Sequence, residues 1–82
     1  MDNFKYYFRV ESDGKPLTLY AIDQRDILME WRFDRRSKVW ERTDRLMYAL
    51  ISLDLDYEQT SFEEAIAFEP TFVEQMKLQG II

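Results

Sequence analysis

The sequence predicts an α+β fold in which an antiparallel meander of three to four strands has one face covered by one longer and two short C-terminal helices. In residues 1–42, apolar and polar residues alternate, which is the pattern of half-buried strands. In residues 43–82, apolar residues recur at helical spacing and two capping sequences are present. The 82 residues suffice for one domain with one core, so 1–42 is predicted to be a β-meander and 43–82 a helical layer.

An Asp-Gly turn between two alternating segments predicts the first hairpin, because such a dipeptide tolerates the positive φ that a tight turn needs. A two-residue turn at Asp13-Gly14 keeps the apolar side chains of both strands on one face. A three-residue loop would set Val10 opposite Pro16 and mix the faces, so we expect the shorter turn. The predicted pairs are Val10 with Leu17, Phe8 with Leu19 and Tyr7 with Tyr20.

The segment from Ile27 to Arg42 is expected to form the next hairpin. Residues 27–33 alternate and favour a strand; the alternative is a helix over Gln24–Phe33 that Asp23 caps. A four-residue loop over 35–38 is favoured, because a two-residue loop would need positive φ at two arginines and would set two glutamates opposite each other. The predicted pairs are Phe33 with Trp40, Arg32 with Glu41 and Trp31 with Arg42.

The meander would present one apolar face that needs a cover. A longer helix capped by Thr43 and ending near Leu53 is expected to lie centrally over it. Capping boxes predict two short helices that begin near Phe62 and Phe72, and Gly80 is expected to end the second in a left-handed conformation. The predicted apolar face comprises Phe4, Tyr6, Phe8, Leu17, Leu19, Met29, Trp31, Phe33 and Trp40.

Several chemistries lack the residues they need. The chain has no cysteine and no histidine, which removes disulfides, thiolates, the commonest general base and the commonest transition-metal ligand. The acidic run Asp54, Asp56, Glu58 resembles the start of a calcium loop, but Gln59 and Ala65 stand where such a loop needs glycine and glutamate, so a solvated loop is expected. We therefore predict no catalytic residues, no cofactor and no metal.

Charge is distributed unevenly along the chain. Residues 1–42 hold nine basic and eight acidic residues, whereas residues 43–82 hold two basic and eight acidic ones. The basic residues cluster around the tip of the second hairpin, beside aromatic residues, and arginine and aromatic side chains are enriched in interface hot spots. The predicted partner-binding residues are Arg32, Arg35, Arg36, Lys38 and Arg42.

These features predict a small non-catalytic protein that binds another protein, of unknown identity, through this hairpin tip and the adjoining charged surface. Nucleic-acid binding through the same tip is the alternative, which the pI of about 4.6 disfavours. An acidic inhibitor of a nucleic-acid-binding protein is third. A homodimer through the helical layer is also possible. The start of the chain lacks a signal-peptide pattern and no apolar run approaches a membrane span, so we expect a cytoplasmic protein with no membrane partner.

Overall fold

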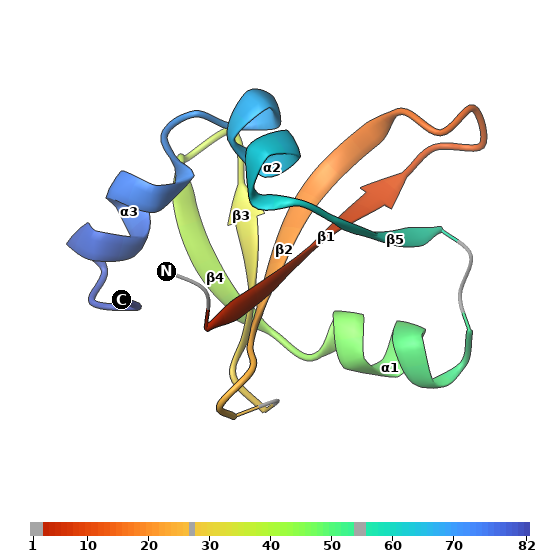
Figure 1. Cartoon of the computed structure of the whole chain (residues 1–82), viewed down its shortest axis with the longest axis horizontal. Coiled ribbons are helices and arrows are strands. Elements are labelled where there is room, and N and C mark those ends of the chain that lie inside the picture. Colours follow the sequence, from red (N-terminus) through yellow and green to blue (C-terminus); the bar gives the residue numbers. More distant parts are fainter. Residues whose placement is uncertain (1–2, 27, 54–55) are drawn as a thin grey trace.

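The sheet contains more strands than the sequence predicts. A computed structural model describes residues 3–26, 28–53 and 56–82. In this part of the chain, five strands form one antiparallel sheet in the order β4-β3-β2-β1-β5 (Figure 1). The α+β class with an antiparallel sheet is confirmed, and the count of three to four strands is wrong. The elements are β1 (Phe4–Val10), β2 (Pro16–Asp23), β3 (Glu30–Asp34), β4 (Val39–Thr43), α1 (Arg45–Ile51), β5 (Tyr57–Thr60), α2 (Phe62–Phe68) and α3 (Phe72–Leu78).

The hairpin of β3 and β4 has the predicted four-residue loop. The carboxylate of Asp34 accepts a hydrogen bond from the amide of Arg36 (2.9 Å), and its carbonyl accepts one from the amide of Lys38 (2.7 Å). Lys38 has a φ of 61°, so a single loop residue carries the left-handed conformation. The three predicted pairs are confirmed: Phe33 with Trp40, Arg32 with Glu41 and Trp31 with Arg42.

The segment before this hairpin is a strand over a shorter range than predicted. β3 begins at Glu30, and the described residues between it and β2 form a loop. The side chains of Asp23 and Asp26 accept hydrogen bonds from amides two residues further on, which is a turn geometry that competes with a helix. The alternative helix over Gln24–Phe33 is therefore wrong for the described residues. Ile27, where the predicted strand begins, lies outside them.

The first hairpin follows the predicted register only away from its turn. Phe8 pairs with Leu19 and Tyr7 with Tyr20, but the register shifts after Arg9 and Val10 pairs with Pro16. The turn is longer than two residues, because the amide of Glu11 already donates to the carbonyl of Lys15 (2.9 Å) and Gly14 takes the positive φ. Because of this shift, the apolar side chains of the two strands beyond it lie on the same face of the sheet. Leu17, a predicted core residue, is instead 45% exposed.

A fifth strand, β5, pairs with the free edge of β1, where the sequence predicts only a loop. Thr60 lies opposite Tyr6, and Glu58 lies opposite Phe8. The ring of Tyr57 packs edge-on against that of Tyr20, with 5.4 Å between the ring centroids. Residues Tyr57–Thr60 thus belong to the sheet. Asp54 and Leu55 of the predicted loop lie outside the described residues.

Helices α2 and α3 cover the apolar face of the sheet. The core cluster includes Phe8, Phe33 and Trp40 from the strands, and Ala65, Phe72 and Met76 from the helices. Ser61 caps α2 by accepting the amide of Glu64 (3.1 Å), which confirms the first capping box. The second box is wrong, because the hydroxyl of Thr71 instead donates to Glu69 (2.8 Å). Gly80 has the predicted positive φ, and the amide of Ile81 donates to the carbonyl of Met76, which closes α3 as a Schellman motif.

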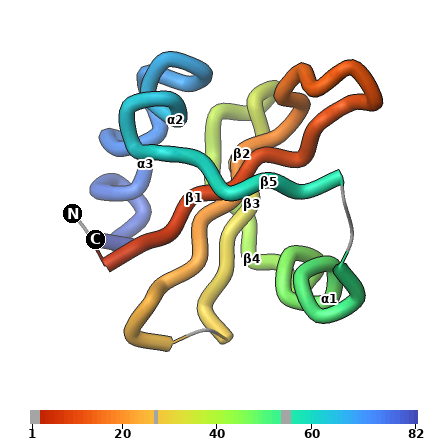
Figure 2. The backbone as a smooth tube through the Cα atoms, turned by 45° about the vertical axis from the view of Figure 1, so that its right-hand side comes forward, coloured from red at the N-terminus to blue at the C-terminus, as the bar shows by residue number. Residues whose placement is uncertain are grey.

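Helix α1 lies on the opposite face of the sheet, which corrects the prediction that it covers the same face as the other two helices (Figure 2). Buried Leu46 and Ala49 of α1, together with Tyr20 of β2, lie outside the main core cluster. The helix begins after Asp44 rather than Thr43, which belongs to β4, and it ends at Ile51, so that Leu53 is exposed. The sheet is therefore covered from both sides.

At one residue on the outer edge of β4, a side chain binds both backbone groups. The amide group of Gln79, just after α3, accepts the backbone N–H of Trp40 (2.7 Å) and donates to the Trp40 carbonyl (2.9 Å). It thereby occupies the backbone groups through which another strand would pair. No helix in the described part of the chain is long and apolar enough to cross a membrane.

Candidate functional site

The predicted basic tip is anchored to the body of the protein by one buried carboxylate. Glu69, at the end of α2, accepts hydrogen bonds from the ammonium of Lys38 (3.1 Å) and from the guanidinium of Arg35 (3.4 Å). The guanidinium of Arg35 also lies over the ring of Phe68, 4.2 Å from its centroid. These contacts tie the loop to the end of α2, and the one carboxylate offsets one of the loop's three positive charges.

Two other predicted residues also have partners within the chain. Arg32 forms an ion pair with Glu41 (2.7 Å), and Arg42 lies over Trp31 while donating to the carbonyl of Leu28 (3.3 Å). Arg36 is exposed, and no described residue contacts its guanidinium through an ion pair or hydrogen bond. The tip therefore brings Arg35 and Lys38 together and leaves Arg32 and Arg42 on the strands. That these five residues bind a partner stays a prediction.

Glu69 is ionised in spite of its burial. Its side chain is 3% exposed, and this burial by itself would raise the pKa. The hydrogen bonds from Thr71 and Lys38 outweigh burial, so the pKa of Glu69 lies below its ordinary value. The carboxylate thus stabilises the folded state through its charge. The sequence around Glu69 does not indicate this role, because the two cations that it binds lie 34 and 31 residues earlier in the chain.

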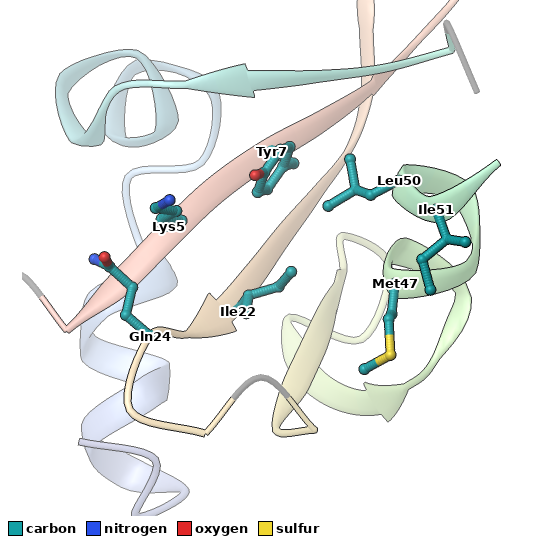
Figure 3. A pocket seen from close by; sticks show the side chains of 7 residues that line it. All are labelled: Lys5, Tyr7, Ile22, Gln24, Met47, Leu50 and Ile51. Carbon is teal, nitrogen blue, oxygen red and sulfur yellow. The ribbon is translucent and has the colours of Figure 1, made fainter. Parts of the chain in front are cut away.

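A groove lies between α1 and the sheet, with a volume of about 380 Å³. Side chains of β1 and of the end of β2 form one wall, and side chains of α1 form the other (Figure 3). Most of the lining is apolar, and Lys5 and Gln24 bring polar groups to one end. The lining residues are Lys5, Tyr7, Ile22, Gln24, Met47, Leu50 and Ile51. No sequence motif indicates this groove, because its residues come from three separate segments of the chain, 5–7, 22–24 and 47–51.

Further exposed apolar side chains lie on α1, beside the groove residue Ile51, and just after the helix. Tyr48 is 65% exposed, Ile51 73%, and Leu53, just after the helix, 82%. The inner side of the same helix buries Leu46 and Ala49. Side chains of this size on one short segment exceed the scattered apolar residues that a protein surface normally shows. We name this surface, made of the groove residues with Tyr48 and Leu53, the α1 surface.

A buried glutamate positions α1 over the sheet. Glu30 of β3 is fully buried, and one of its carboxylate oxygens accepts the amide of Met47 in the first turn of α1 (2.9 Å). The other oxygen is buried and has no hydrogen-bond partner among the described residues. Burial raises the pKa of Glu30, and the Met47 hydrogen bond opposes this rise only in part. The contact therefore orients the helix at the cost of a buried charge.

Replacing Glu30 by glutamine is expected to stabilise the fold by about 1 kcal/mol at pH 7, because glutamine keeps the acceptor for Met47 and removes the buried charge. The raised pKa means that the folded state binds more protons than the unfolded state, so stability falls as pH rises from the ordinary value of 4.5 through the folded pKa. The difference in unfolding free energy between the parent chain and Glu30→Gln should therefore vanish below pH 4.5. Urea denaturation of both chains at pH 7 and pH 4 measures it, and a less stable variant at pH 7 would contradict it.

The acidic residues that the structure describes do not gather into a metal site. No group of three or more carboxylates within residues 3–26, 28–53 and 56–82 is arranged to hold a metal ion. Asp54, the first residue of the acidic run, lies outside these ranges. The α1 surface is thus the candidate site with the clearest geometry. Comparisons with protein-family models, with curated proteins and with solved structures found no match for this chain.

Proposed function

We propose that this protein is a non-catalytic binding protein whose α1 surface takes an apolar segment of another protein, with a carboxylate of that segment against Lys5. The observation that carries the proposal is the apolar groove of about 380 Å³ that exposed apolar side chains of α1 extend. Burying such side chains against a partner contributes about 25 cal/mol for each Å² of apolar surface removed from water.

The extent of the apolar surface favours a protein over a small molecule as the occupant. A groove of this volume is large enough for a small ligand. A small ligand would contact the lining and leave Tyr48 and Leu53 in water, where they are 65% and 82% exposed. A peptide segment or helix can fill the groove and also cover these outer side chains.

The charge at one end of the groove selects among protein segments. Lys5 lies beside Gln24, and no described carboxylate forms an ion pair with its ammonium. A partner carboxylate at this end would gain an ion pair, whereas a basic group would be repelled. We therefore expect the bound segment to carry an aspartate or glutamate next to its apolar residues.

Replacing Ile51 by glutamate is expected to weaken binding of such a segment by tenfold or more, because about 1.4 kcal/mol corresponds to tenfold and one buried isoleucine contributes about this much. Peptides selected from a random library on the purified protein provide the ligands, and fluorescence anisotropy measures their Kd. The selected peptides should share apolar residues and one acidic residue. Lys5→Glu should weaken binding of the same peptides, and exchanging their acidic residue for lysine should restore it.

Leu78→Glu is the matched control for this experiment. Leu78 on α3 is 74% exposed, which is close to the 73% of Ile51, but it lies on the helix that covers the other face of the sheet. Equal binding to Ile51→Glu and to the parent chain would contradict the proposal. Sedimentation of the parent chain tests whether a second copy is the occupant. A dimer that Ile51→Glu dissociates would mean self-association through the α1 surface in place of binding to a foreign segment.

A further inference from the structure

A second hollow, lined by arginines and hydroxyl groups, lies on the sheet face that carries α1. Its volume is about 370 Å³, and each of its six lining residues has a polar or charged end. They come from all of β1, β2, β3, β4 and α1, so the fold rather than one sequence motif brings them together. We name it the arginine hollow. Its residues are Arg9, Thr18, Tyr20, Arg32, Thr43 and Arg45.

The lining of the arginine hollow holds three arginines and no acidic residue, although Arg9 also lines another hollow with Glu11, Asp13 and Asp56. Arg32 is paired with Glu41 at 2.7 Å. No described carboxylate forms an ion pair with Arg9 or Arg45. The hydrogen bond from the amide of Arg36 is the main cause that lowers the pKa of the Asp34 carboxyl, and the charge of nearby Arg32 contributes less. Two guanidinium groups therefore face one hollow without an ionic partner in the described chain.

The hydroxyl groups of the hollow suit an anionic ligand. Tyr20 is 2% exposed, and burial together with the hydrogen bond that its hydroxyl donates to Tyr57 raises its pKa to about 12, so it adds neither a negative charge nor a free donor to the hollow. Thr18 and Thr43 are half-buried and bring two more hydroxyls to the same hollow. Hydroxyl donors supplement guanidinium groups at anion sites without adding charge.

We infer that the arginine hollow binds the phosphate group of a small phosphate monoester. Guanidinium groups match the oxygen geometry of phosphate through paired N–H donors, and three of them around one hollow can share its three free oxygens. A carboxylate presents only two oxygens and one charge, so it would use the site less completely. The volume also leaves room for the group that carries the phosphate.

A small ligand fits the charge of the whole chain better than a nucleic acid does. The net charge is −5, so the chain as a whole repels a long polyanion. A monoester enters the hollow alone and meets only the local excess of positive charge. This site goes beyond the proposed protein-binding function, since it uses none of the groove residues of the α1 surface.

The test is a titration of the ¹⁵N-labelled chain with inorganic phosphate and with pyrophosphate at pH 7 and constant ionic strength, followed by the Nε–H signals of the arginines. We expect saturable shifts at Arg9, Arg32 and Arg45. The double variant Arg9→Gln with Arg45→Gln should raise the midpoint about tenfold or more, which corresponds to about 1.4 kcal/mol. If this variant fails to fold, as judged by urea denaturation, Arg45→Gln alone is used and should raise the midpoint measurably.

Arg36→Gln is the matched control, because Arg36 is exposed at the hairpin tip and outside the hollow. It should leave the midpoint within twofold. Shifts that increase without saturation, or an equal loss in Arg36→Gln, would overturn the inference and leave a general charge effect. An oligomer of thymidines that shifts the same signals at lower concentration, and that pyrophosphate does not displace, would overturn it in favour of nucleic-acid binding.

Discussion

Replacing Phe72 by alanine is expected to destabilise the fold by about 3–5 kcal/mol. Phe72 at the start of α3 is fully buried, and its ring lies 5.3 Å from that of Tyr6, 5.7 Å from that of Phe62 and 6.0 Å from that of Trp40. The indole of Trp40 also donates to the Phe72 carbonyl (3.1 Å). Removing the ring leaves a cavity where α2, α3 and the sheet meet, and rigid neighbours close such a cavity only in part.

This loss is large for a chain of 82 residues, whose total stability is expected to be about 4–12 kcal/mol. Urea denaturation followed by tryptophan fluorescence measures the change, since Trp40 lies against the altered site. Phe72→Leu should cost less than half as much because it fills most of the volume. Leu78→Ala on the same helix should stay within about 0.5 kcal/mol, because Leu78 is exposed. A Phe72→Ala variant as stable as Leu78→Ala would contradict the packing of α3 on the sheet.

Turn geometry and cross-strand charge predict the register of the β3–β4 hairpin, because the shorter loop is unfavourable on both counts. A shorter loop would need two arginines with positive φ, and the observed loop needs only Lys38. The first hairpin shows the limit of this reasoning. Its turn and its strands prefer registers that differ by one residue, and a shift after Arg9 accommodates both. A single register applied to the whole ladder would miss this shift.

The position of α1 and the existence of β5 depend on contacts between distant segments. Apolar residues surround much of α1, so its periodicity does not say which sheet face it covers. Tyr7, Tyr20 and Ile22 give the second face of the sheet enough apolar surface to require a cover of its own. β5 has four residues, two of them polar and exposed, and it becomes a strand because β1 offers a free edge. The α1 surface follows from these two placements, which is why no motif indicates it.

Replacing Glu69 by alanine is expected to destabilise the fold by about 2 kcal/mol at pH 7, and replacing it by glutamine is expected to destabilise the fold by about 1 kcal/mol. The carboxylate is 3% exposed and accepts charged hydrogen bonds, which contribute more than neutral ones. The full penalty of a broken buried ion pair does not apply, because Arg35 and Lys38 are 49% and 54% exposed and can turn to water. Glutamine still accepts a hydrogen bond from Thr71, so it retains part of the stabilisation.

The pH dependence separates the charge of Glu69 from its packing. Its lowered pKa means that the unfolded state binds more protons, so its contribution is present above the ordinary value of 4.5 and is lost as pH falls through the folded pKa. The advantage of the parent chain over Glu69→Gln should therefore shrink as pH falls below 4.5, in urea denaturation at pH 7, 4 and 3. Glu30→Gln is the matched control, since Glu30 is also a buried glutamate but its pKa is raised. At pH 7 the two variants should change stability in opposite directions, and a change of the same sign would contradict the assignment of Glu69 as a stabilising charge.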